Sequence, residues 1–215
     1  MYVVLSNGGA MVWFILLASM VGVAVFMERL IYYHRSQIAV ADFLKGIRNC
    51  LKRNNQVEAI SICENTPGPV ARIAKTTILH SDRNRSDIRE AIDAVAIQED
   101  RLLERNLPIL WTVVQITPLL GLLGTVIGMV KAFKRIQEEG RLVTATDLAG
   151  GIWEALIATG FGLAVAVIGY VAYQFLHARK TDMVRDRDWC ATDLINIFAE
   201  LERVRRKDEF DLSEP

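Results

Sequence analysis

Charge is missing from three long stretches of this sequence. No Asp, Glu, Lys or Arg occurs in residues 10–27, 107–130 or 155–176, although charged residues make up 23% of the chain. Each stretch is close to the roughly 20 apolar residues that a helix needs to cross a bilayer. None shows the recurring polar face of a helix in a soluble protein. The sequence therefore predicts an integral membrane protein with three transmembrane helices.

Residue clusters that could carry catalysis or bind a metal are also missing. The three cysteines show no C-x-x-C spacing and the three histidines are scattered, so we expect buried thiols and no metal site. We find no Ser/His/Asp set or phosphate-binding loop, and we expect no enzyme and no cofactor. The 25 Lys and Arg balance the 25 Asp and Glu without forming a basic stripe, which argues against a nucleic-acid partner.

The distribution of basic residues predicts the orientation in the membrane. The first twelve residues hold no Lys or Arg, so the first stretch lacks the start of a cleaved signal peptide and is expected to remain as a helix. Residues 28–106 carry thirteen basic residues, which places them in the cytoplasm and the N-terminus in the periplasm of a bacterial inner membrane. Four basic residues of the short outer loop disagree with this rule: Lys131, Lys134, Arg135 and Arg141.

The long loop after the first span has a helical pattern. Apolar residues at helical spacing predict short helices over 40–51, 57–63 and 70–79. Asn54-Asn55 is expected to end the first of them, and Thr66-Pro67-Gly68-Pro69 the second. The loop is thus predicted to be a small helical cytoplasmic region.

Two of the membrane helices are expected to be long. Ser86 is the predicted N-cap of a helix that continues through Pro108 and Pro118, with kinks, to about residue 136. The third span is expected to continue into the cytoplasm as far as Leu201, and neighbouring subunits would cover such projections. The predicted segments are a periplasmic N-terminus (1–9), the first span (10–33), a cytoplasmic helical loop (34–85), a cytoplasmic helix extension (86–107), the second span (108–130), a periplasmic loop (131–151), the third span (152–176), and a cytoplasmic helix and tail (177–215).

Small and polar residues recur within the second and third spans. Small faces let helix backbones approach closely in lipid. Two interpretations stay open: packing within one subunit, or the lining of a narrow shaft that another helix fills. The candidate residues are Gln115, Pro118, Gly121, Gly124 and Gly128 in the second span, and Ala155, Gly162 and Ala166 in the third.

Two hydroxyls within the spans are candidate groups of an ion pathway. Thr125 and Thr159 lie at similar places on two antiparallel spans. Each could merely bond to a carbonyl of its own helix. Because a hydroxyl both donates and accepts, the pair could also hold a water or relay a proton.

The carboxylates of the spans lie only at their ends. Glu154, at the outer end of the third span, is either a proton entrance or an interfacial carboxylate that pairs with Lys131. Glu28 and Arg29 are expected to form an interfacial ion pair. No span holds a carboxylate at mid-depth, so a group that charges and discharges inside the membrane would come from a partner.

Three segments resemble signatures of the MotA/TolQ/ExbB proton-channel family. Residues 107–133, LPILWTVVQITPLLGLLGTVIGMVKAF, resemble its second-span signature, and residues 154–163, EALIATGFGL, resemble its third. Cys63 and the segment 66–72, TPGPVAR, resemble its cytoplasmic loop. The resemblance extends over about residues 12–180, and three spans with a short N-terminus favour the ExbB/TolQ branch over the four-span flagellar stators.

This resemblance implies a homopentamer whose second and third spans enclose a pore. Two copies of an ExbD- or TolR-like single-span protein would lie inside and bring the membrane aspartate. The family's pore residues correspond to Thr125 and Thr159, and its third-span glutamate to Glu154. An ExbB-like chain, the favoured alternative, would energise TonB for transport across the outer membrane. A TolQ-like chain would energise TolA for envelope maintenance, and a non-conducting membrane scaffold is the third alternative; proton and sodium both stay open as the ion.

Overall fold

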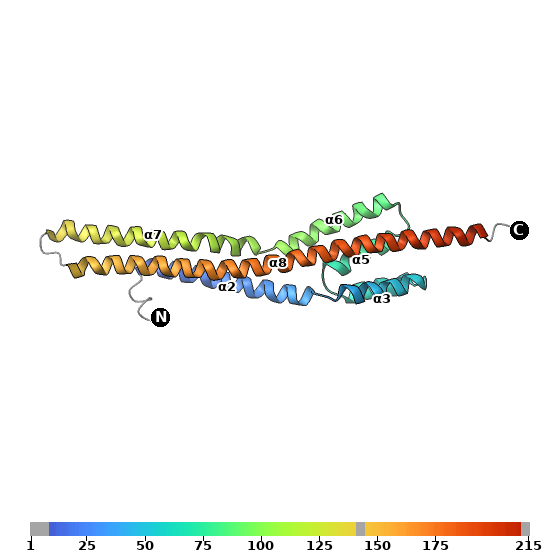
Figure 1. The fold of residues 1–215 in the computed structure, drawn as a ribbon, viewed down its shortest axis with the longest axis horizontal. Coiled ribbons are helices and arrows are strands. Elements are labelled where there is room, and N and C mark those ends of the chain that lie inside the picture. The colour runs from blue at the N-terminus through green and yellow to red at the C-terminus, as the bar shows by residue number, and fades with distance from the viewer. Residues whose placement is uncertain (1–8, 141–144, 212–215) are drawn as a thin grey trace. The chain divides into compact units, whose positions relative to one another are not determined.

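The chain is built from helices. The computed structural model describes residues 9–140 and 145–211, and every regular element within these ranges is a helix (Figure 1). The predicted all-α class is thus confirmed. The helices are α2 (Gly9–Ser36), α3 (Val40–Lys52), α4 (Gln56–Asn65), α5 (Pro69–Leu79), α6 (Arg85–Glu104), α7 (Leu107–Glu139) and α8 (Ala145–Asp211).

The first of two compact units holds the apolar helices. It comprises Met1–Leu30 with Asn106–His177, and so contains most of α2, all of α7 and the first half of α8. Three helical stretches of the described chain are long and apolar enough to cross a membrane, as predicted. Large apolar side chains on them stay uncovered, such as Leu119 at 62% and Ile168 at 71% exposure. These faces suit contact with lipid or with other subunits.

The expected continuous helix from residue 86 into the second span is wrong. α6 ends at Glu104 and α7 begins at Leu107. Between them Asn106 has a left-handed backbone with φ of 66°, which Asn adopts more readily than most residues. Pro108 lies in the first turn of α7, where no helical partner exists for a backbone N–H. Pro108 therefore starts a helix instead of kinking one.

Pro118 lies inside α7 without ending it, as expected. Because proline has no N–H, the Val114 carbonyl loses its usual helical partner. The buried Thr117 hydroxyl donates to that carbonyl oxygen over 3.4 Å, a weak hydrogen bond. A side chain of the same helix thus partly replaces the missing backbone bond.

The second compact unit comprises Ile31–Arg105 with Ala178–Pro215. Its core is apolar: Ile47 of α3, Ala74 of α5 and Leu194 of α8 are completely buried. The loop residues at helical spacing thus form the inner face of a small helical bundle, as the pattern predicted.

Most helix ends of this unit agree with the sequence-based boundaries. Asn55 begins α4 by accepting from the Glu58 N–H over 3.2 Å and donating to the Glu58 carboxylate over 2.8 Å, a reciprocal cap. The expected cap at Ser86 is wrong, because α6 already begins after Asn84. The Ser86 hydroxyl donates instead to the carboxylate of Asp87.

Candidate functional site

A seam of small residues joins α7 to α8 within one chain. A Cβ built on Gly124 would lie only 2.6 Å from the Ala158 Cβ, and one on Gly128 would lie 2.7 Å from the Ala155 Cβ. A Cβ on Gly162 would lie 2.7 Å from the Thr117 carbonyl oxygen. Only residues without large side chains allow this approach. The small residues of α7 and α8 pack against each other within one chain. If these helices line a shaft, the lining residues must therefore lie on other faces of the two helices.

The two candidate threonines lie beside this seam. The Thr159 hydroxyl donates across it to the Gly121 carbonyl oxygen over 2.8 Å. The Thr125 hydroxyl donates within its own helix, to the Leu122 carbonyl oxygen over 2.6 Å. Because Gly121 and Thr125 are one helical turn apart, the Thr159 hydroxyl lies about one turn of α7 from Thr125. Each hydroxyl oxygen retains capacity to accept a hydrogen bond.

A groove of about 650 Å³ runs beside Thr125 on the outside of the helix pair. Apart from the threonine hydroxyl, the side chains that line it are apolar. It is lined by Thr125, Val126, Met129, Val130, Phe133, Ile152, Ala155 and Leu156. A lining of apolar side chains with one hydroxyl suits contact with an apolar helix that carries one polar group.

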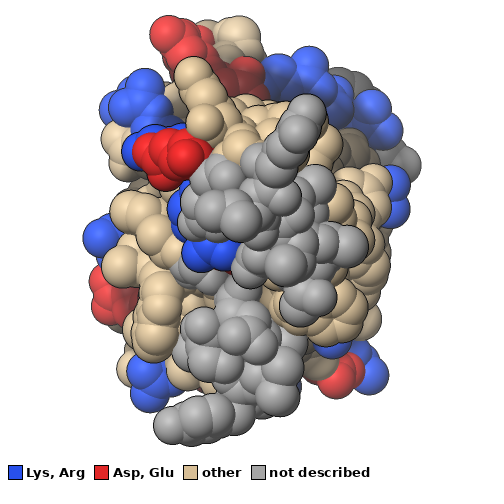
Figure 2. All heavy atoms as spheres, turned by 90° about the vertical axis from the view of Figure 1, so that its left-hand side faces the viewer, with Lys and Arg blue, Asp and Glu red and all other residues tan. Residues whose placement is uncertain are grey.

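Glu154 forms an ion pair in the structure. The Lys131 ammonium donates to its carboxylate over 2.9 Å, and the carboxylate side chain is 28% exposed. Lys134 pairs with Glu138 over 3.5 Å. Figure 2 faces this end of the molecule, and basic and acidic side chains lie beside one another on the face that it shows. Two of the outer-loop cations that disagreed with the charge rule thus have acidic neighbours, while Arg141 lies outside the described residues.

The remaining predicted residues lie at three kinds of position. Arg29 is 2% exposed and donates to the Glu28 carboxylate over 2.7 Å, and Asn106 donates to the same carboxylate over 3.2 Å. Ala166 is buried, whereas Gln115 is exposed and Pro118 half-buried. Glu28 and Arg29 therefore help to hold the end of α2 beside the start of α7.

Sequence reasoning missed two members of the seam. Ala158 faces Gly124, and the buried Thr117 both faces Gly162 and donates to the Val114 carbonyl. The spacing of the sequence could have predicted the position of Ala158 on this face, because it lies three residues after Ala155 and four before Gly162. Thr117 is, like Thr125, a hydroxyl residue of the second span, but its hydrogen bond to the Val114 carbonyl depends on the proline that follows it.

All three cysteines are buried thiols of the second unit, as expected. Burial raises the pKa of the Cys63 thiol from 9.0 to about 12, and the pKa of Cys190 to the same value. Burial also raises the pKa of Cys50. These thiols therefore stay neutral at physiological pH, which suits a structural role in the core.

Residues 65–189, more than half of the chain, match the model of the MotA/TolQ/ExbB proton channel family. The chain belongs to this family. The match includes α7, the seam with α8 and both threonines, and it confirms the resemblance found in the sequence. With three apolar helices, this family membership makes the chain a multi-pass inner-membrane protein of a transport family.

Several relatives carry ExbB or TolQ names. The chain is 28% identical to a putative biopolymer transport protein ExbB homolog of Methanothermobacter thermautotrophicus, over 83% of this chain but 63% of that protein, which is less than two thirds of its length. It is 30% identical to the biopolymer transport protein ExbB of Neisseria meningitidis, over 83% of this chain and 86% of that protein. It is 32% identical to the Tol-Pal system protein TolQ of Pseudomonas aeruginosa, over 53% of this chain and 49% of that protein.

Proposed function

We propose that this chain forms the wall of a proton conduit in an energising complex, and that a partner supplies the titrating carboxylate. One observation carries the proposal. The three uncharged stretches 10–27, 107–130 and 155–176 hold no acidic side chain. The acids that border them are paired: Glu28 bonds to Arg29, and Glu154 to Lys131. A gradient-driven machine needs a group that changes charge within the membrane. That group is brought by an ExbD- or TolR-like single-span protein.

The threonines provide the polar path toward this carboxylate. Protons enter from the periplasmic side near Glu154 and reach the partner's aspartate beside Thr125 and Thr159. Protonation removes the cost of a charge in a low-dielectric shaft, and release on the cytoplasmic side restores it. A potential of 100 mV contributes about 2.3 kcal/mol per proton, which suffices to bias a step between states of similar energy.

The uncovered apolar faces support an assembly of several copies around the partner. Val167 and Ile168 of α8 remain 65% and 71% exposed in the single chain. The groove beside Thr125 provides a seat for a neighbouring helix that carries one polar group. In the proposed complex, five copies surround two partner helices, the N-terminus is periplasmic and the C-terminus cytoplasmic. No nucleic acid takes part.

We further propose the ExbB-like role, in which the complex energises a TonB-like protein for transport across the outer membrane. This proposal is supported by the relative from Neisseria meningitidis, which is named ExbB and is matched over 86% of its length. A TolQ-like role toward a TolA-like protein is the second candidate, supported by the Pseudomonas relative. Complementation of strains that lack either system separates the two roles.

Thr159→Val tests the conducting function with Thr159→Ser as its matched control. Valine keeps the shape and removes the hydroxyl that bonds to the Gly121 carbonyl. Loss of one interhelical hydrogen bond in a membrane costs only about 0.6 kcal/mol on average, so assembly should persist. We expect the valine variant to abolish TonB-dependent uptake in cells and the serine variant to retain it.

The scaffold alternative makes the opposite prediction for the same pair. A non-conducting scaffold tolerates Thr159→Val, Thr125→Val and Glu154→Gln, because none of them removes a large packing group. Normal uptake with Thr159→Val, at wild-type protein levels, contradicts the conduit.

A further inference from the structure

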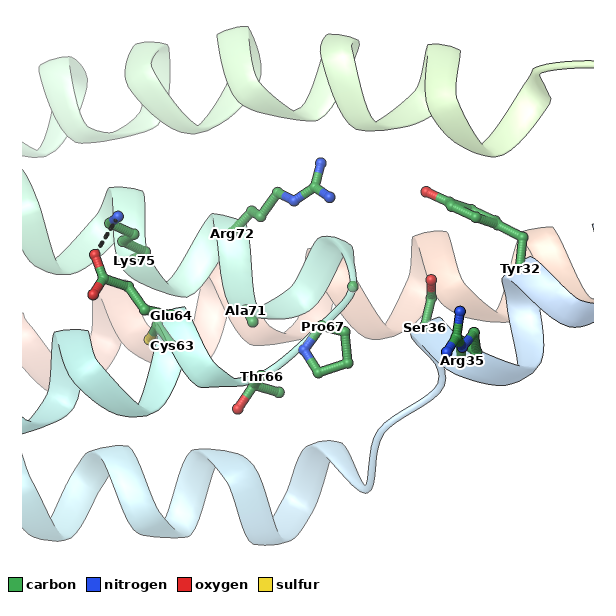
Figure 3. Close-up of a pocket in the computed structure, with 11 residues that line it drawn as sticks. Tyr32, Arg35, Ser36, Cys63, Glu64, Thr66, Pro67, Ala71, Arg72 and Lys75 are labelled. Atoms are coloured by element: carbon green, nitrogen blue, oxygen red, sulfur yellow. Dashed lines mark hydrogen bonds and ion pairs between the residues drawn. The ribbon is translucent and has the colours of Figure 1, made fainter.

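A second cleft lies in the helical unit, at the end of the first membrane helix (Figure 3). Its volume is about 710 Å³. The end of α2 contributes Tyr32, Arg35 and Ser36, and α5 contributes Arg72 and Lys75. The proposed conduit uses none of these residues.

The cleft carries an excess of positive charge. Three basic side chains line it against one carboxylate, Glu64, which accepts from Lys75 over 2.7 Å. Arg72 uses one nitrogen to hold the buried Glu99 carboxylate at 2.6 Å, and its guanidinium extends over the cleft (Figure 3). Arg35 makes no ion pair with any residue that the structure describes. At least one guanidinium is therefore free for a ligand, and a second has donors to spare.

The Ser36 hydroxyl is a further donor at this cleft. Ser36 is only 9% exposed, and its hydroxyl has no hydrogen-bond partner in the described ranges of the chain. In Figure 3 this hydroxyl is directed into the cleft. A ligand with oxygen acceptors in the cleft could therefore accept a hydrogen bond from the Ser36 hydroxyl.

The backbone at the cleft also favours an anion. α5 begins there after Gly68, and no side chain caps its N-terminus. The first N–H groups of a helix lack partners and carry partial positive charge, which attracts phosphate groups. Arginine, serine and a helix N-terminus together form the donor set that phosphate oxygens bind.

We infer that this cleft binds the phosphate of an anionic lipid headgroup at the membrane surface from which α2 emerges. The position supports a lipid as the source. Tyr32 follows the apolar run of α2, as tyrosines do at the level of lipid headgroups. Arg35 comes three residues later, and a long arginine side chain reaches headgroups from such a position.

Lipid titration of the purified full-length protein tests this inference. The delipidated protein is titrated with dioleoyl phosphatidylglycerol or dioleoyl phosphatidylcholine and bound lipid is counted by native mass spectrometry. Inorganic phosphate at matched ionic strength forms a third arm, measured by equilibrium dialysis. We expect tighter binding of phosphatidylglycerol than of phosphatidylcholine, and Arg35→Gln should weaken it about fivefold.

Arg53→Gln is the matched control, because Arg53 is an exposed cation of the same unit outside the cleft. It should leave the affinity for phosphatidylglycerol unchanged. Ser36→Ala should weaken binding while keeping every charge, and an unchanged circular dichroism spectrum shows that each variant is folded. Binding of free phosphate, but not of the lipid, with the same Arg35 dependence contradicts the lipid source. Equal losses with Arg35→Gln and Arg53→Gln, or equal binding of both lipids, overturn the site.

Discussion

At the scale of single residues, Gly68 fixes the connection between α4 and α5. Its φ is 108°, in the region that side-chain-bearing residues rarely adopt. A Cβ built on it would also lie 2.5 Å from the Ser36 carbonyl oxygen. Conformation and space therefore both require glycine at this position.

Gly68→Ala should destabilise the protein by about 2 kcal/mol or more, because strain and a backbone clash add. Thermal unfolding in detergent, followed by circular dichroism, measures the shift. Gly46→Ala is the control: it lies inside α3 with nothing within 4 Å of an added Cβ, and should be neutral or slightly stabilising. Equal midpoints for both variants contradict the structural role of Gly68.

The buried thiols predict a pH dependence of stability and reactivity. The pKa of Cys63 is raised from 9.0 to about 12 in the folded protein, so the unfolded chain loses this proton first as the pH rises. The contribution of this neutral thiol to the free energy of unfolding is therefore fully present below about pH 9. It is lost as the pH rises from about 9 to 12. We expect the thiols to resist alkylation by iodoacetamide at about pH 8 unless the protein is unfolded in dodecyl sulfate. Rapid alkylation of the folded protein contradicts their burial.

The sequence was enough to predict which polar residues of the membrane helices are candidate site residues. It was not enough to predict which groups these residues bond to. Thr125 and Thr159 stand out because hydroxyls are unusual in apolar spans. The bond from Thr159 to the Gly121 carbonyl depends on the offset between two helices, which no local pattern encodes. The ion pair of Glu154 with Lys131 was one of two alternatives, since both charges lie near the same span ends.

At the scale of helices, the α7–α8 seam depends on missing side chains. The hydrophobic effect stabilises the contact between α7 and α8 little, because lipid tails are as apolar as the side chains. Close van der Waals contact therefore holds the two helices together. An added methyl at Gly162 meets the Thr117 carbonyl oxygen at 2.7 Å, and backbone cannot move aside as a flexible side chain can.

Gly162→Ala should separate the two helices and lower stability by about 1–3 kcal/mol. Gly160→Ala, two residues earlier on the same helix, meets nothing within 4 Å in this chain and serves as the control. The melting temperature of each purified variant provides the comparison. A smaller loss for Gly162→Ala than for Gly160→Ala places the tight contact elsewhere.

The helices themselves were largely predictable, and the break between α6 and α7 was not. Uncharged runs and apolar spacing are strong signals that average over many residues. The break depends on one left-handed residue, Asn106, followed by Pro108. A proline within a long apolar pattern suits either a kink or a first helical turn, and local sequence does not choose between them.

At the scale of the whole molecule, the polar groups of the membrane helices are distributed as expected for one subunit of a larger complex. The uncharged stretches of the membrane helices contain the Thr125 and Thr159 hydroxyls, and paired carboxylates border them at Glu28 and Glu154. Their outward faces are apolar and uncovered. The chain belongs to the proton channel family, and in the proposed function a partner supplies the carboxylate that the uncharged stretches lack.

Proton flux into liposomes tests most directly the proposal that this chain forms the conduit wall and a partner supplies the titrating carboxylate. The chain alone, its complex with the single-span partner, and a complex whose partner has the membrane aspartate changed to asparagine are each reconstituted with a trapped pH-sensitive dye and a potassium diffusion potential. We predict acidification above the protein-free rate only for the intact complex. Equally fast acidification with the chain alone, or with the asparagine partner, contradicts the claim that the titrating carboxylate comes from outside this chain.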